Sequence, residues 1–203
     1  MRFSQKDAIC KKHNRDCVVR VRDLERLLTA QGVSAAKMDG ITRKLRECGR
    51  LPTGGRGINA PTIGPSEAAI ILVAVAGSPK ANEADTRVAK LEPLLSGGRV
   101  GARTLLEAVT SLLENPMNLE SLTEVRIART RRRAAFIFRD GKVEEFYTAK
   151  PDARTYIFSV EGIMSAPLLQ LVARAIRDGD RGARNSQGSP GAAVRSPGRG
   201  QSE

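Results

Sequence analysis

Residues 20–51 read RVRDLERLLTAQGVSAAKMDGITRKLRECGRL, and their apolar spacing predicts two helices joined by a tight turn. Leucines recur at helical spacing between residues 20 and 31, as on one face of a helix. Gly32 ends this first helix, and Ser34 can cap a second helix over residues 35–48. The side chains expected to pack the two helices together are Leu24, Leu27, Leu28, Ile41 and Leu45.

The basic charge of the chain is unevenly distributed. The 203 residues carry a formal net charge of +12. Residues 1–60 contribute +8, residues 121–178 contribute +4 and residues 179–203 contribute +2, whereas residues 61–120 contribute −2. A basic excess at the two ends, with a near-neutral middle, favours a nucleic-acid face beside a separate assembly region.

Most basic residues of the second helix lie off its apolar face, so we expect them to point outward. A recognition helix needs donors on its outer side and a preceding helix that braces it. The candidate DNA-binding residues of this region are Lys37, Thr42, Arg43, Lys44, Arg46, Arg50 and Arg56. The alternative is a basic helical hairpin with no role in nucleic-acid binding.

Residues 41–52, ITRKLRECGRLP, resemble the end of the recognition helix in winged helix-turn-helix regulators of the MarR and related types. Leu45 and Gly49 fit the Leu-x-x-x-Gly pattern of that helix end, and Leu51 would begin the strand that leads into a wing. The resemblance covers residues 20–62 and implies binding of double-stranded DNA.

The candidate wing is the segment Gly54-Gly55-Arg56-Gly57. Glycines would let its backbone approach the sugar-phosphate wall, and Arg56 would suit a narrow, negative minor groove. A flexible linker is the alternative interpretation of the same composition.

Beyond residue 62 the pattern predicts helices first and strands afterwards. The helix over residues 65–76 is apolar all round, which indicates a buried central helix. Asp140-Gly141 is a strong hairpin signal between strands. The remaining expected elements are helices over 84–95 and 105–113, three strands within 124–148, a fourth strand over 154–160 and a closing helix over 166–176.

We therefore predict an α+β fold, mostly α, in four parts. The last part is rich in Gly, Ser, Pro and Arg, and such a segment cannot bury enough apolar surface to become ordered. The parts are a basic winged helix-turn-helix domain over residues 1–62, a helical oligomerisation region over 63–118, an antiparallel sheet plus helix over 119–178, and a disordered basic tail over 179–203.

A second basic cluster is expected at a junction between strands. It could contact phosphates, since arginine binds phosphate oxygens with its fork of donors, or it could protect a sheet edge from pairing. Its members are Arg129, Arg131, Arg132 and Arg133.

Cys10, His13, Cys17 and Cys48 could in principle hold zinc, because the first three recur on one face of a helix. Their spacing matches no standard zinc finger, so we expect no metal and no cofactor. Glu144 and Glu145 are neighbours on a strand and point to opposite faces, so they cannot act as a catalytic pair. With a single His and no other catalytic cluster, we expect no enzymatic activity.

The expected function is binding of double-stranded DNA by a homo-oligomeric transcription regulator. The order of elements also resembles the small terminase subunits of tailed phages, which form rings that mark viral DNA for packaging, and uncharacterised prophage proteins. A dimer in solution favours the regulator, and a large ring favours the packaging subunit. The longest apolar run is about half the length that spans a bilayer, so no membrane partner is expected. An odd number of cysteines and the lack of a recognisable signal peptide favour a cytoplasmic protein.

Overall fold

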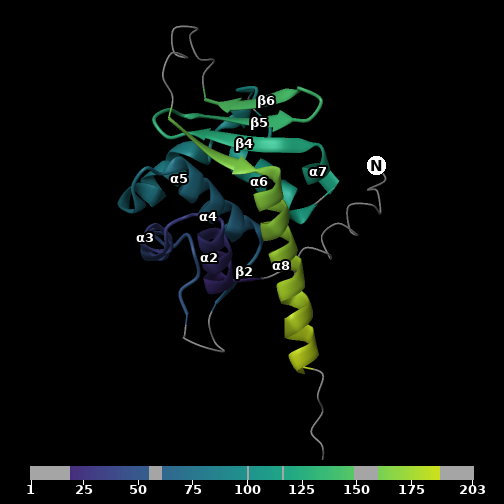
Figure 1. The fold of residues 1–203 in the computed structure, drawn as a ribbon. Coiled ribbons are helices and arrows are strands. Elements are labelled where there is room, and N and C mark those ends of the chain that lie inside the picture. Colours follow the sequence, from purple (N-terminus) through teal and green to yellow (C-terminus); the bar gives the residue numbers. More distant parts are fainter. Residues whose placement is uncertain (1–18, 55–60, 100, 116, 149–159, 188–203) are drawn as a thin grey trace, which may run out of the picture.

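A computed structural model describes residues 19–54, 61–99, 101–115, 117–148 and 160–187 (Figure 1). Within these ranges the chain forms seven α-helices, a five-stranded antiparallel sheet and a separate two-stranded pairing. The predicted α+β class is therefore confirmed. Within the same ranges, no helix combines the length and apolar character needed to cross a membrane.

The two predicted N-terminal helices are present and lie between two short strands. The elements are β1 (Val19–Arg20), α2 (Val21–Ala30), α3 (Ala35–Glu47) and β2 (Thr62–Ile63). Strands β1 and β2 pair antiparallel, which brings the two ends of the helical pair together. Leu51, expected to begin a strand, does not belong to one; its side chain is buried in the core instead.

Helix α4 (Pro65–Gly77) lies at the centre of the helical layer, with α5 (Ala84–Leu91) and α6 (Leu105–Glu114) packed against it. Proline at its first position and the Glu67 carboxylate, which accepts the N–H of Gly64 at 2.9 Å, begin the helix. Most of its side chains are buried, which confirms the prediction of a central apolar helix.

Four further elements complete the helical middle of the chain. Thr104 caps α6 by accepting the N–H of Glu107, whose carboxylate accepts the N–H of Thr104 in return. The elements are the 3₁₀ helix η2 (Ala81–Glu83), α5 (Ala84–Leu91), α6 (Leu105–Glu114) and α7 (Met117–Glu120).

The five-stranded sheet has the strand order β3-β6-β5-β4-β7. One face packs on the helices, and its core includes the rings of Phe136 and Phe146 with centroids 4.9 Å apart. The predicted hairpin turn is present, with Gly141 at φ 81°. The strands are β3 (Leu95–Ser96), β4 (Leu122–Ala128), β5 (Arg133–Phe138), β6 (Val143–Tyr147) and β7 (Glu161–Ser165).

The strand expected over residues 154–160 falls almost wholly outside the described residues, and the strand that pairs with β4 is β7. Its glycine, Gly162, reads as a strand breaker in the sequence. In the fold, β7 passes so close to the end of α4 that a Cβ at Gly162 would lie 2.6 Å from the carbonyl carbon of Ala76. A glycine is required there because the backbones of β7 and α4 approach closely, and not because the chain turns.

Helix α8 (Ala166–Gln187) begins directly after β7 and packs on β1 and α6. It runs beyond the helix expected over 166–176, so residues 179–187 are helical where a disordered tail was expected. The extension includes Gly179 and Gly182, which are poor helix formers, but an established helix propagates more easily than it starts. Residues 188–203 lie outside the described part of the chain.

Candidate nucleic-acid interface

The α2–α3 pair is held together by fully buried apolar side chains. Leu24 and Leu28 of α2 and Ile41 and Leu45 of α3 each have 0% exposure, as expected from the sequence. Leu27 is half-buried and packs at the edge of the same core. This contact fixes α3 against α2 and decides which side of α3 faces out.

The turn between the helices is built as predicted. Gly32 adopts φ 96°, in the left-handed region that glycine favours, and ends α2. The N–H of Val33 then donates to the carbonyl of Leu28 at 3.2 Å. Ser34 caps α3 by accepting the N–H of Lys37 at 3.3 Å.

The exposed strip of α3 is less basic than the sequence suggests. It consists of Ala35, Ala36, Asp39, Arg43 and Glu47. The Arg43 side chain has no hydrogen-bond or ion-pair partner among the described residues. The strip therefore presents small side chains at the start of α3, one available cation further along, and two carboxylates beside it.

Thr42 and Arg46, both candidate DNA contacts, instead join α3 to α2. The buried Thr42 hydroxyl donates to Glu25 Oε1 at 2.6 Å, and Arg46 Nη2 lies 3.4 Å from the same oxygen. Lys44 is half-buried, with its Nζ 3.9 Å from a Glu47 carboxylate oxygen. Glu25, which no sequence pattern indicated, joins both side chains to the neighbouring helix.

Arg50 is also engaged within the protein. It donates to Asp85 Oδ1 at 2.6 Å and to Glu92 Oε2 at 2.9 Å, tying the segment after α3 to α5. Burial opposes the charge, but the hydrogen bonds to the two carboxylates raise the pKa of Arg50 above its ordinary value. Asp85 in α5 and Glu92 at its C-cap are seven residues apart and hence lie on the same side of the helix.

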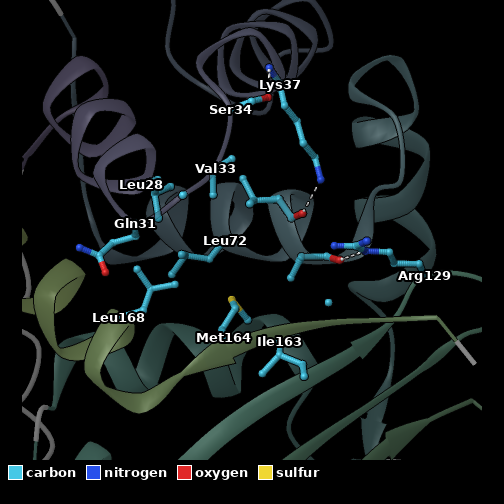
Figure 2. Close-up of a pocket in the computed structure, with 14 residues that line it drawn as sticks. Leu28, Gln31, Val33, Ser34, Lys37, Leu72, Arg129, Ile163, Met164 and Leu168 are labelled. Carbon is cyan, nitrogen blue, oxygen red and sulfur yellow. Dashed lines mark hydrogen bonds between the residues drawn. The ribbon is translucent and has the colours of Figure 1, made fainter.

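The expectation that Lys37 points outward is wrong. Its Nζ donates to the carbonyl oxygen of Val75 at 3.2 Å, near the C-terminus of α4 (Figure 2). Burial, and then the nearby charge of Arg129, lower the pKa of Lys37 below its ordinary value. Helix α3 approaches η2 closely, since a Cβ at Gly40 would lie 2.7 Å from the Cβ of Ala81, and this side of α3 is therefore covered.

The second basic cluster divides between structural roles and the surface. Arg129 Nε donates to the carbonyl of Ala76 at 3.0 Å, and Arg133 pairs with Glu145 across β5 and β6. Arg131 is half-buried, and Arg132 is exposed. The cluster is thus divided in the structure, and phosphate contact by its surface members stays a prediction.

Arg87, which no sequence pattern singled out, is 8% exposed and donates to the carbonyls of Gly77, Ala128 and Arg131. Together with Lys37 and Arg129 it satisfies the carbonyl end of α4. Cations are favoured there, because the C-terminus of a helix carries partial negative charge.

Several predicted features fall outside the described residues. Arg56 and the glycines at 55 and 57 are among them, so the wing stays a prediction, as does any site formed by Cys10, His13 and Cys17. Cys48 is exposed, and the described part of the chain contains no cluster of metal-ligating side chains.

The expectation for the two adjacent glutamates of β6 is confirmed. Glu144 accepts hydrogen bonds from Arg103 and Ser96, whereas Glu145 pairs with Arg133, so the two carboxylates serve opposite sides of the strand. They do not form a pair that could share a substrate.

Comparison of the chain with protein-family models, with curated proteins and with solved structures gives no match.

Proposed function

We propose that this chain binds double-stranded DNA and regulates transcription, with α2 and α3 acting as a helix-turn-helix. The observation that carries the proposal is the exposed strip of α3, where two alanines at the helix start are followed by Arg43, which has no partner within the described part of the chain. Such a strip can enter the major groove only if a second helix braces it, and α2 does so through the buried leucine contact.

The geometry of α3 supports contact with both the DNA backbone and the base edges. Ala35 and Ala36 lack bulk, so the first turn can approach a phosphate with its unsatisfied N–H groups. Arg43 lies seven residues after Ala36 and hence on the same side of the helix, roughly 10 Å further along at 1.5 Å per residue. An arginine in this position can donate to guanine or to phosphate.

Helix α2 adds two exposed arginines beside the same strip. Arg22 and Arg26 line a groove that Ala35 and Asp39 of α3 line from the other side. Arg26 lies 3.5 Å from Asp23, but both side chains are well exposed, and such a pair yields readily to a phosphate.

The carboxylates of Asp39 and Glu47 oppose non-specific binding to the polyanion. We therefore propose that this unit has modest affinity for random sequence and depends on few contacts. A carboxylate beside an arginine can also accept from cytosine, which makes Asp39 a candidate for base selection.

The test is duplex binding by fluorescence anisotropy, with random pools and two salt concentrations. Arg43→Ala should weaken binding and reduce the slope of log affinity against log salt by about one. Asp39→Asn should strengthen binding to random sequence. The matched control is Arg174→Ala, which removes an exposed arginine of α8 whose Nε lies 3.5 Å from Asp178.

Arg46→Ala distinguishes side chains that contact DNA from side chains that hold α3 against α2. Because Arg46 lies beside Glu25, its loss should affect stability more than the salt slope. If Arg43→Ala binds like the parent protein at both salts, or if the parent does not bind duplex, the proposal fails. A regulator of this kind reads paired half-sites, so light scattering should give a dimer.

A further inference from the structure

A cavity of about 290 Å³ lies behind the α2–α3 turn, and we call it the turn cavity. It is bounded by the turn itself, the C-terminal half of α4, strand β7 and the start of α8 (Figure 2). Its volume corresponds to roughly ten water molecules, or to a small organic ligand. It is distinct from the exposed strip of α3, which faces away from α4.

Two cations reach the turn cavity from one side. Lys37 Nζ and Arg129 Nε each spend one N–H on α4, on the carbonyls of Val75 and Ala76. A lysine ammonium has three N–H groups and an arginine has five, so most of their donors remain for another acceptor. No further hydrogen bond is formed by either side chain within the described residues.

Among the described residues, none that lines the turn cavity carries a carboxylate. The two cations have no counter-charge from these lining residues, and the charge of Arg129 adds to burial in lowering the pKa of Lys37. An anion placed between them would remove this repulsion and would fill unused donors. Capping of α4 uses one hydrogen bond from each side chain, and their other donors have no partner among the described residues.

The opposite side of the turn cavity is aliphatic. Leu72 of α4, Met164 of β7 and Leu168 of α8 lie across from the two cations (Figure 2). Met164 is 3% exposed, so this wall belongs to the core of the protein. A ligand that fills the cavity must have an anionic end and a short apolar body.

We infer that the turn cavity binds a small aliphatic monocarboxylate. The carboxylate lies between Lys37 and Arg129, and the alkyl chain lies against Leu72, Met164 and Leu168. A planar carboxylate matches the paired donors of a guanidinium. Free phosphate is more strongly hydrated and has no apolar part, so it would make no favourable contact with the aliphatic wall.

The site also touches the segment that positions α3. Gln31, Val33 and Ser34 of the turn line the cavity, so a bound ligand restrains the turn from behind. This expectation rests on the proposed function: the ligand should change the affinity of the protein for duplex DNA, and DNA should change the affinity of the protein for the ligand by the same factor.

The test follows the methyl resonances of the methionines by NMR on the full chain, titrated with acetate, butanoate and hexanoate. Hexanoate should shift Met164, which lines the cavity, and leave Met117, which is 67% exposed, unchanged. Affinity should rise by about fourfold for each added CH₂. Hexanamide, which has the same shape without the charge, should bind at least about tenfold more weakly.

Two pairs of variants locate the site. Leu168→Phe fills the cavity and should abolish the Met164 shift, whereas Leu171→Phe, at a 41% exposed position of the same helix, should not. Lys37→Met should lower the affinity for hexanoate at least about tenfold, and Lys44→Met should leave this affinity unchanged. Leu168→Phe keeps both cations, so it remains informative if Lys37→Met does not fold.

Equal binding of hexanoate and hexanamide, equal shifts of Met164 and Met117, or a response to inorganic phosphate alone would each overturn the inference. Because the titration uses protein without DNA, a failure of DNA binding does not affect it. Conversely, a chain that binds duplex but shows no Met164 shift keeps the proposed function and loses this site.

Discussion

Arg87→Met removes a buried cation that connects three parts of the chain. The guanidinium donates to Ala128 at 2.7 Å, to Gly77 at 3.2 Å and to Arg131 at 3.3 Å, always to a carbonyl oxygen. Methionine has a similar length and keeps the apolar contacts of the side chain, but it donates no hydrogen bond. The substitution therefore removes the side-chain donor from the Gly77 carbonyl, at the end of α4, and from the Ala128 carbonyl, at the end of β4.

The expected loss of stability follows from these bonds. A hydrogen bond from a charged donor contributes about 1.5–3 kcal/mol, and the two stronger bonds give about 3–6 kcal/mol. Removing the buried guanidinium returns part of this energy, because burial disfavours its charge and lowers the pKa of Arg87. We expect a net loss of about 3 kcal/mol, or a melting temperature lower by roughly 6–12 °C for a chain of this length.

Urea unfolding followed by circular dichroism measures this loss. The control is Lys90→Met, one turn further along α5 at an exposed position, which should change the free energy of unfolding by less than about 0.5 kcal/mol. If Arg87→Met and Lys90→Met unfold at the same urea concentration, the three carbonyls do not depend on Arg87, and the account of how α4 ends is wrong.

Glu144→Gln should destabilise the protein at neutral pH. Burial acts against the charge, but hydrogen bonds from Arg103 and Ser96 hold the pKa of Glu144 below its ordinary value of 4.5. The stabilisation is thus present above that value and is lost as the pH falls through the lower folded-state pKa. The urea midpoints of the parent protein and the variant should therefore converge in acid. A difference that stays constant with pH would contradict this expectation. Gly162→Ala should cost about 3 kcal/mol in thermal melts, because its Cβ would collide with the Ala76 backbone, and an unchanged melting temperature would show that β7 can shift. Ser78→Ala should leave stability unchanged or raise it by up to about 1 kcal/mol, because the Ser78 hydroxyl is buried without a hydrogen-bond partner among the described residues; a clear loss would indicate an internal water there.

Local signals in the sequence predicted most elements of the fold. Pro65 and an all-apolar run identified α4, and Asp140-Gly141 identified the β5–β6 hairpin. Strands β3 and β7 were missed because each is defined by its partner. Leu95 pairs with Tyr147, far along the chain, and Gly162 is in a strand because β7 pairs with β4, where Gly162 lies opposite Ile127.

The candidate interface was predictable only in part, for the same reason. Helical spacing identified the buried leucines and the exposed Arg43, because both depend on α2 and α3 alone. It could not place Lys37 or Arg50, which lie at the flanks of α3 and turn toward α4 and α5. A side chain at the edge of the exposed face of a helix turns toward an acceptor on the neighbouring element. That element lies far away in the sequence, so local spacing does not predict the contact.

The carbonyl end of α4 has a kinetic consequence. Two of its donors come from far along the chain, one from each direction: Lys37 is 38 residues from Val75, and Arg129 is 53 residues from Ala76. The third, Arg87, is only 10 residues from Gly77. The last turn of α4 is therefore complete only after α3, α5 and the β4–β5 connection have docked. Such long loops close late, so we expect this helix end to be unformed in the folding transition state and substitutions there to speed unfolding more than they slow folding. The same three contacts should join the N-terminal helices and the sheet into one cooperative unit in native-state hydrogen exchange.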